Sequence, residues 1–476
     1  MMKKLVVTLL ISSMVATLCA CGSSGSGNTT SSTAASTAGT DTVSEASSEA
    51  VSEATEASSE AASKSDTEAS GGLKGEFSVF HFFEEDGAGT SKAFWDAANK
   101  FQEENPDVKI NFQFTDSNNY QEKLTTLMAG DELPDVWLTK GDMLPTFADG
   151  ELIQAADQYI SKDADWKGSY VEGAFNDCTY DGTQWGVPFQ MQANCIGVYN
   201  QAIFDECGID GWPETWTELL ADCDKIKAAG YTPIAMGNKD QWLAESAFFN
   251  TYAYRYVDQA WFDSLKNNQG AKFTDEQFVK ALKGFQNIAQ YFNSDMNSID
   301  QDEMFSLYYN KKAAMFFDGA WSVGTMISSC PEDVLATTHV GLLPAVDGEP
   351  GTKFDTASGA GWNYVISSKL EGDNLTACLA FLKAVTTGEY ADDALTQGFI
   401  SAAKTSDDYD MSTLNPLFAE YYQLASQMNN MTIFDCSLPA EIGSGVLYAD
   451  TQQLIAGSMT PEDMAKDCQE TMEANY

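Results

Sequence analysis

Short apolar runs alternate, from about residue 75 onward, with longer segments whose apolar residues recur at helical spacing. The helix between the first two strands, for example, has Phe94, Ala97, Ala98 and Phe101 on one face and ends before Pro106. The pattern predicts strands at residues 76–83, 107–114 and 135–140, with one helix from residue 91 that ends at Asn105-Pro106 and another from residue 119 that ends at Gly130. Strand, helix, strand, helix, strand predicts a parallel sheet covered by helices on both faces.

The same alternation returns in the second half of the chain. Further strands are predicted at residues 231–236, 313–317 and 339–344, and the glycine-rich segment 356–367 has the alternation of another. The C-terminal part is helical, and its last helix begins with Thr460 as N-cap and Pro461 at the first helical position. The whole pattern predicts an α/β fold.

Length and charge narrow the class of protein. A chain of 476 residues exceeds what one hydrophobic core usually organises, so two domains or lobes are expected. The formal net charge of -44 would repel nucleic acid and an anionic membrane surface, and it favours solubility. Arg255 is the single arginine, whereas sites for phosphate or carboxylate usually use arginine's planar fork. A neutral or cationic ligand is therefore expected.

The N-terminus has the layout of an exported protein. Lys3 and Lys4 precede an apolar stretch that is too short for a stable membrane span, which predicts a signal peptide at residues 1–20. Residues 18–21 (LCAC) resemble the bacterial lipobox, which implies that Cys21 is lipidated. Residues 21–75 are rich in Ser, Ala and Glu, so they predict a disordered tether between anchor and domain.

The cysteines and histidines give little support for metal or nucleophilic chemistry. The eight cysteines after the anchor show no CxxC or Cys/His spacing, so mostly buried free thiols are expected, with one or two bridges left open. The only histidines are His81 and His339, which leaves almost no basis for a zinc site or a serine–histidine triad. No metal and no cofactor are predicted.

Several motifs, in order along the chain, resemble those of the bacterial extracellular solute-binding proteins, family 1, the receptors of sugar ABC importers. They run from about residue 76 to the C-terminus and comprise NPDVKINFQF, NYQEKLTTLMAGDELPDVW, YDGTQWGVPFQMQANCIGVYN, FDECGIDGWPETWTELL, YYNKKAAMFFDGAW, VGLLPAVDGEPG and TQQLIAGSMTPEDMAK. In the fifth of these, Lys311 stands where the family has glycine. Each motif is weak alone, but seven in sequence order make a specific resemblance.

The resemblance implies a two-lobed periplasmic-binding-protein-like fold of type II, in which each lobe is a sheet flanked by helices and a hinge joins them. The chain would cross between lobes near Gln192, Gly361 and Lys404. Lobe 1 would comprise residues 76–191 and 362–404, and lobe 2 residues 192–361 and 405–476. Such a protein closes on its ligand by a ligand-driven population shift.

A sugar site needs polar side chains for hydroxyl groups and flat aromatic rings for the apolar face of a pyranose. Ligands of open α/β sheets lie beyond the carboxyl ends of the strands, and this sequence places both kinds of side chain there. The predicted ligand-binding residues are Glu84, Asp142, Gln190, Asn238, Trp242, Asp318, Trp321 and Trp362. Asp318 would accept hydrogen bonds from hydroxyl groups, Gly319 would turn the chain, and Trp321 would stack on the ring.

Simpler structural roles stay open for several of these residues. The alternative role of Asp318-Gly319 is a strand-to-helix turn, and that of Trp321 and Trp362 is a place in the core. Asn238 suits the cap of a turn, Glu84 suits a solvated loop, and His81 suits strand packing.

The sequence thus favours a lipid-anchored receptor on the outer face of the cytoplasmic membrane. It would capture a neutral mono- or oligosaccharide as a monomer and deliver it to separate permease subunits, without binding nucleic acid. A first alternative keeps the receptor but gives it a cationic ligand such as a polyamine, held in an acidic, aromatic site. A second alternative is an exported glycoside hydrolase with two carboxylates across a cleft. No catalytic motif supports the hydrolase, so a non-enzymatic protein is expected.

Overall fold

The first hydrophobic core surrounds a six-stranded mixed sheet in the computed structural model, which describes residues 72–475. Five strands follow one another in the order β2-β1-β3-β14-β4, and β7 also pairs with β14. The strands are β1 (Gly75–His81), β2 (Val108–Phe114), β3 (Val136–Lys140), β4 (Ile153–Gln154), β7 (Val187–Pro188) and β14 (Trp362–Ser367). β1 runs parallel to β2 and β3, whereas β14 is antiparallel to β3, β4 and β7.

Helices from two distant stretches of the chain complete this first core, whose buried residues lie at 77–189 and 364–403. The helices are α1 (Thr90–Glu104), α2 (Tyr120–Ala129), α3 (Leu144–Asp149), α4 (Asp157–Ile160), α5 (Ala164–Gly168), α15 (Gly372–Ala384) and α16 (Glu389–Thr396). In α1 the apolar face predicted from the sequence is the buried one, and Phe94 and Phe101 both pack against Phe381 of α15. A small hairpin, β5 (Thr179–Tyr180) with β6 (Thr183–Gln184), adds a two-stranded sheet.

The second core lies around a four-stranded sheet of order β10-β11-β9-β12. Its strands are β9 (Ile196–Asn200), β10 (Thr232–Ala235), β11 (Ala313–Asp318) and β12 (Thr338–Gly341). β10 and β11 are parallel, and β9 is antiparallel to β11 and β12. All six residues of β11 are buried, as its apolar run predicts.

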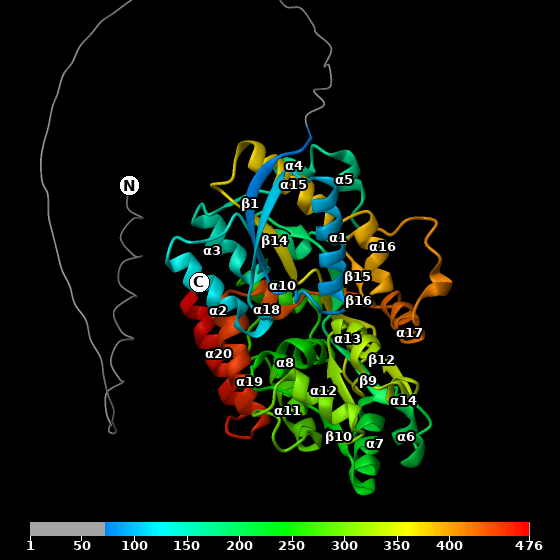
Figure 1. The fold of residues 1–476 in the computed structure, drawn as a ribbon. Helices are drawn as coiled ribbons and strands as arrows, with labels where there is room; N and C mark the ends of the chain where they lie inside the picture. The colour runs from blue at the N-terminus through cyan, green and yellow to red at the C-terminus, as the bar shows by residue number, and fades with distance from the viewer. Residues whose placement is uncertain (1–71, 476) are drawn as a thin grey trace, which may run out of the picture. The chain divides into compact units, whose positions relative to one another are not determined.

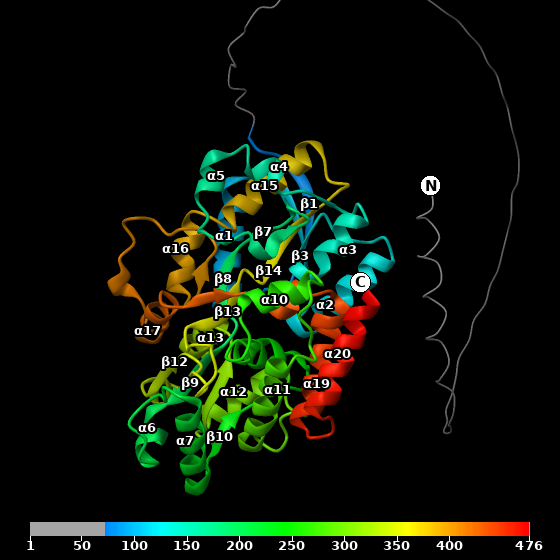
Figure 2. The same ribbon diagram turned by 180° about the vertical axis from the view of Figure 1, so that it is seen from behind.

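The second core takes buried residues mainly from 193–357 and 417–472. Its helices are α6 (Gln201–Glu206), α7 (Trp216–Ala229), α8 (Trp242–Ala244), α9 (Asn250–Ala253), α10 (Gln259–Lys266), α11 (Glu276–Ile288), α12 (Gln301–Tyr309), α13 (Trp321–Ser329), α14 (Glu332–Leu335), α17 (Pro416–Ala425), α18 (Phe434–Ser437), α19 (Leu447–Ile455) and α20 (Pro461–Asn475). Two π-helical turns, Glu245–Phe249 and Glu441–Val446, interrupt this set. Figures 1 and 2 show the strands of the first core (β1, β14) and those of the second (β9, β10, β12) in different parts of the folded unit.

A third sheet, between the two cores, is made where the chain passes from one to the other. Its order is β15-β8-β13-β16, with β8 (Gln190–Ala193), β13 (Asp355–Gly359), β15 (Ile400–Ser401) and β16 (Asn429–Met431). β8 is antiparallel to both β13 and β15, so three passages of the chain are hydrogen-bonded side by side. Figure 2 labels β8 and β13. The carboxylate of Asp177 accepts a hydrogen bond from the Gly361 amide at 3.0 Å and so fixes the second passage to the first core.

The predicted α/β class is confirmed, with one correction to the sheet. The first three strands are parallel, as their intervening helices require, but β14 returns antiparallel because it enters from the other core. The last helix begins as predicted, since the Thr460 hydroxyl accepts a hydrogen bond from the Asp463 amide at 3.1 Å. The proposed boundaries of two moving lobes stay a prediction.

Among the described residues there is no disulfide and no helix that could span a membrane. The eight cysteines there are all free, and seven of them are buried. Within residues 72–475 no helix is both long and apolar enough to cross a membrane. The predicted signal peptide, Cys21 and nearly all of the tether lie outside the described residues.

Candidate binding site between the two cores

The end of β3 meets the second core through a buried ion pair. The Lys140 ammonium lies 2.7 Å from Oδ2 of Asp435 in α18 and 3.1 Å from the hydroxyl of Tyr448 in α19. Tyr448 in turn donates a hydrogen bond to the same Asp435 oxygen at 2.5 Å. The Asp435 side chain is fully buried and that of Lys140 is 12 % exposed, so water screens this pair little. The pair joins the last residue of a first-core strand to two helices of the second core.

Three further hydrogen bonds surround the ion pair. The hydroxyl of Ser246, in the first π-helical turn, donates to the other Asp435 oxygen at 3.2 Å and accepts from the amide of Asn194 at 3.1 Å. Ser444, in the second π-helical turn, donates to Asp142 at 2.7 Å. π-Helical turns are rare and are frequently found at functional sites. Here both of them supply side chains to one polar network.

Charge in the network is concentrated on the pair itself. Burial opposes the charged form of Lys140, but attraction to Asp435 and its neighbours outweighs it and holds the Lys140 pKa well above its ordinary value. Burial raises the pKa of Asp142 to about 6, although Lys140 and Ser444 oppose the rise. Burial also raises the pKa of Glu245 well above its ordinary value, and neither of its carboxyl oxygens has a hydrogen-bond partner.

The first core brings aromatic side chains to this network. Trp362, partly buried at the start of β14, packs edge-on against Phe82 and Tyr120 with ring centroids 5.1 and 5.4 Å apart. The Lys140 ammonium lies 5.5 Å from the centroid of Trp362. The sequence-predicted Trp362 and Asp142 are therefore brought to the same junction, since Asp142 follows Lys140 by two residues.

The second core presents its own aromatic pair where β10 and β11 end. Trp242 and Trp321 are both partly buried, and their ring centroids are 5.9 Å apart. The Trp321 indole packs directly against the turn at Gly319. A Cβ atom on Gly319 would lie 2.0 Å from the indole ring, so only glycine leaves room for it. The glycine thus makes room for the tryptophan as well as for the turn.

Asp318 is the last residue of β11, directly before that turn, and is fully buried. One of its oxygens accepts a hydrogen bond from the Gln301 amide at 2.7 Å, and the other accepts from the Gly319 backbone at 2.7 Å. Burial raises its pKa to about 7, against hydrogen bonding from Gly319, Gln301 and Trp321. Its contacts in the structure are those of a residue that fixes the turn carrying Trp321.

The remaining predicted residues are more scattered. The buried Asn238 side chain accepts a hydrogen bond from the Ala244 amide at 2.9 Å and so caps the turn into α8. Gln190 is buried in β8, and Glu84 is exposed in the loop after β1. The predicted tryptophans therefore form two separate groups, Trp362 on the first core and Trp242 with Trp321 on the second. Glu84 lies on an exposed loop.

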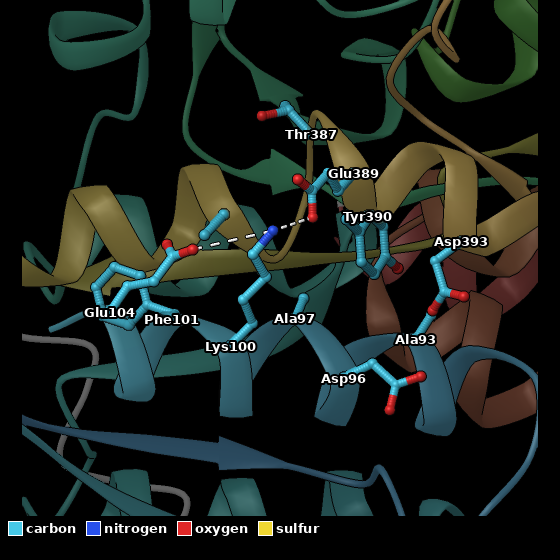
Figure 3. A pocket seen from close by; sticks show the side chains of 11 residues that line it. Ala93, Asp96, Ala97, Lys100, Phe101, Glu104, Thr387, Glu389, Tyr390 and Asp393 are labelled. Carbon is cyan, nitrogen blue, oxygen red and sulfur yellow. Dashed lines mark hydrogen bonds and ion pairs between the residues drawn. The ribbon is translucent and has the colours of Figure 1, made fainter. Parts of the chain in front are cut away.

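A pocket of about 370 Å³ occurs elsewhere, between α1 and α16 (Figure 3). Alanines and the rings of Phe101 and Tyr390 contribute apolar lining, and Lys100 reaches across it to pair with Glu389. None of the predicted ligand-binding residues of the described chain lines it. The polar and aromatic junction, not this pocket, is the candidate site.

Two residues singled out in the sequence have structural roles. The Arg255 guanidinium is fully buried and donates to the backbone carbonyls of Leu343, Pro344 and Asp355 at 2.8, 2.9 and 2.6 Å. Arg255 therefore stabilises the segment that leads into β13. His81 packs in the first core as expected, and burial lowers its pKa to about 4. Among the described residues no group of three or more His, Cys, Asp or Glu side chains is placed to hold a metal ion.

Asp435, Tyr448 and Ser444 are the site residues that sequence reasoning missed. They lie about 300 residues after their partners Lys140 and Asp142. The only signal was a carboxylate in the apolar segment TIFDCSLP, which is unusual because an unpaired charge is rarely buried.

The sequence matches a known family model and several curated proteins. Residues 84–391 match the family model described as bacterial extracellular solute-binding protein. An uncharacterized ABC transporter extracellular-binding protein of Pyrococcus horikoshii is 26 % identical over 256 residues, which cover 52 % of this chain and 56 % of that protein. A maltotriose-binding protein of Pyrococcus abyssi is 22 % identical over 243 residues, covering 49 % and 48 %. The chain aligns with about half the length of these curated relatives.

Solved structures extend the likeness over the whole folded unit. A chitin oligosaccharide binding protein has a TM-score of 0.75 at 20 % identity, covering 84 % of this chain and 98 % of its own. An ABC substrate-binding protein of Listeria monocytogenes, solved with cycloalternan, has a TM-score of 0.67 at 18 % identity, covering 84 % and 99 %. At these identities the likeness shows the fold alone.

Proposed function

The chain belongs to the bacterial extracellular solute-binding protein family, and from this premise we propose that it is the carbohydrate receptor of an ABC importer. It captures a neutral mono- or oligosaccharide between the two cores and delivers it to separate permease subunits. Family membership agrees with the expectation of a binding protein and not an enzyme, and it argues against a glycoside hydrolase.

The observation that carries the proposal is that each core presents partly buried aromatic rings close to polar side chains, and that the buried Lys140–Asp435 pair joins the two cores. Trp362 and Phe82 come from the first core, and Trp242 and Trp321 from the second. Flat rings of this kind suit the apolar faces of sugar rings, and a few placed polar groups suit their hydroxyls. Relatives and similar structures named for maltotriose and chitin oligosaccharide point to the same class of ligand.

The residues predicted from the sequence divide, by burial and hydrogen bonding, into proposed ligand contacts and residues that fix the shape of the site. Trp242, Trp321 and Trp362 are partly buried, which leaves ring surface for a ligand. Glu84 is exposed and Gln190 lies on a passage strand, so both suit hydroxyl groups. Asp142, Asn238 and Asp318 already hold hydrogen bonds within the chain, so we assign them to fixing the site's shape.

The three hydrogen-bonded passages between the cores support a hinge. β8, β13 and β15 are short and lie side by side, so a small change in their backbone angles would rotate one core against the other. The lobes in this proposal are residues 76–191 with 362–404, and 192–361 with 405–476. The two buried clusters divide near the same residues.

The anchor is the second part of the proposal. A two-chain acyl group on Cys21, after removal of residues 1–20, would hold the protein at the outer face of the cytoplasmic membrane. Mass spectrometry of the processed N-terminus tests it. A diacyl mass on Cys21 that is lost in Cys21→Ser and kept in Cys19→Ser is expected, and an unmodified N-terminus would contradict it.

Ligand binding is tested by thermal unfolding of the full chain against neutral sugars, oligosaccharides and polyamines. A ligand at 100 times its dissociation constant adds about 2.7 kcal/mol of stability, a readily measured rise in midpoint. The rise should occur with one class of sugar and should disappear in Trp321→Ala. Phe114→Ala is the matched control, because Phe114 is 53 % exposed and outside the site. A rise with polyamines alone would overturn the choice of ligand.

A further inference from the structure

The Lys140 ammonium occupies a cage of one carboxylate and two aromatic rings. Asp435 lies 2.7 Å from it and the Tyr448 hydroxyl 3.1 Å. The ammonium lies 5.5 Å from the ring centroid of Trp362 and 5.7 Å from that of Tyr448. A carboxylate with aromatic faces is the chemistry that recognises an ammonium group on a ligand. Here the chain supplies the ammonium itself.

We propose that Lys140 is a specificity-determining residue: it fills, as a built-in cation, a cage that would otherwise accept the ammonium group of a ligand. The junction is thereby left for a neutral ligand. This inference rests on the proposed function in one respect, that the ligand binds at this junction.

The charges around the cage support this role. Asp435 is the carboxylate in contact with the ammonium, and Ser246 and Tyr448 also donate to it. Burial raises the pKa of the other carboxyl groups near the pair, Asp142, Asp177 and Glu245, and the first two already accept hydrogen bonds from Ser444 and from the Gly361 amide. The one carboxylate in contact with the cage is therefore already paired with Lys140, and a second ammonium group there would be repelled by the Lys140 charge.

The cage also depends on both cores. Trp362 and Lys140 belong to strands of the first core, whereas Asp435 and Tyr448 belong to helices of the second. Lys140 crosses the junction, so removing its side chain would leave a vacancy open to both cores. A small cation that entered this vacancy would restore the link.

Chemical rescue tests the proposal directly. Lys140→Ala keeps Cβ and removes three carbons and the ammonium, which together have the size and charge of propylammonium. The full-chain variant is unfolded thermally in rising concentrations of propylammonium chloride, with sodium chloride and 1-propanol at equal concentrations as references. We expect a lower midpoint for the variant, and a saturable rise toward the wild-type midpoint with propylammonium only.

The matched control is Lys369→Ala. Lys369 pairs with Asp131 at 2.8 Å, but both side chains are more than half exposed, so no vacancy forms and no rescue is expected. Equal propylammonium shifts in the wild type and in Lys140→Ala, or no shift in a folded Lys140→Ala protein, would overturn the proposal.

A second measurement does not need the variant to fold. The wild-type chain is titrated with putrescine and spermidine; no saturable shift supports the built-in cation, and a saturable shift overturns it. The propylammonium readout involves no sugar, so its failure is distinct from that of the proposed function. Rescue without any response to neutral sugars counts against the proposed function alone, and a sugar response without rescue counts against the cage alone.

Discussion

Lys140 and Asp435 lie 2.7 Å apart although 295 residues separate them in the chain and each belongs to a different core. Both side chains are largely withdrawn from water. In such a pair, the loss of one partner leaves a buried charge without compensation, which costs more than the intact pair contributes. The contact therefore makes the stability of each core dependent on the position of the other.

Breaking this pair from one side should be strongly destabilising. Lys140→Met and Asp435→Leu are each expected to lower the free energy of unfolding by about 3–5 kcal/mol, and the double variant by clearly less than their sum. Urea unfolding of the four proteins gives the coupling energy. The exposed pair Lys369–Asp131 serves as the control cycle and should give about 1 kcal/mol or less. Additive losses at Lys140 and Asp435 would contradict an energetic link.

Gly141 should be intolerant of a side chain because the two cores meet there. A Cβ atom at this position would lie 2.3 Å from the carbonyl oxygen of Cys436, which no L-residue can accommodate without movement. Gly141→Ala is expected to separate the cores, seen as a larger radius of gyration in X-ray scattering and weaker ligand binding. Gly168→Ala is the control, since nothing lies within 4 Å of its added Cβ. Unchanged scattering for Gly141→Ala would contradict the contact.

Asp318 should make stability fall as pH rises. Its pKa is about 7 in the folded protein and about 4 in an unfolded chain, so between these values the folded state holds a proton that the unfolded state has released. The free energy of unfolding then decreases with pH by at most about 1.4 kcal/mol per unit, and the decrease ends near pH 7.

Asp318→Asn should remove this contribution, because the amide oxygen still accepts a hydrogen bond but does not ionise. Urea unfolding at pH 4, 5, 6 and 7 compares the slopes of wild type and variant. Asp142→Asn is the matched comparison, with an effect of the same sign that ends near pH 6. Parallel slopes for wild type and Asp318→Asn would count against a buried carboxyl with a raised pKa.

Arg255 should not be replaceable by lysine. Its three hydrogen bonds reach three different backbone carbonyls, and a lysine ammonium keeps the charge but not the planar fork. Arg255→Lys is expected to cost at least about 2 kcal/mol, because buried carbonyls lose their donors. Differential scanning calorimetry measures the loss, and Lys369→Arg is the control, because the Lys369 side chain is 65 % exposed. A midpoint within one degree of wild type would show that the carbonyls find other donors.

Local patterns in the sequence predicted most of the elements. The sequence alone predicted the apolar face of α1, the buried run of β11 and the Thr460 cap, because each depends only on neighbouring residues. The direction of β14 was not, since it depends on a strand that arrives from the other core.

The candidate site was predictable only in its local half. Lys140 and Asp142 stand at a strand end, where a functional residue is expected, but their partners Asp435 and Ser444 were not foreseen. Nothing in periodicity links segments 300 residues apart. Lys311 replaces the glycine of the family motif, and its φ of 54° lies in the left-handed region that favours glycine. The sequence alone showed the replacement but not this backbone conformation.

The three passages between the cores have a consequence for biosynthesis. The first core needs buried residues up to Ala403 and the second up to Met472, so neither can be completed from a contiguous piece of the chain. A ribosome must release some four-fifths of the polypeptide before the first core can close, and nearly all of it before the second. The nascent protein thus remains without a finished globule for most of its synthesis, the condition in which a polypeptide can still be threaded through a secretion channel.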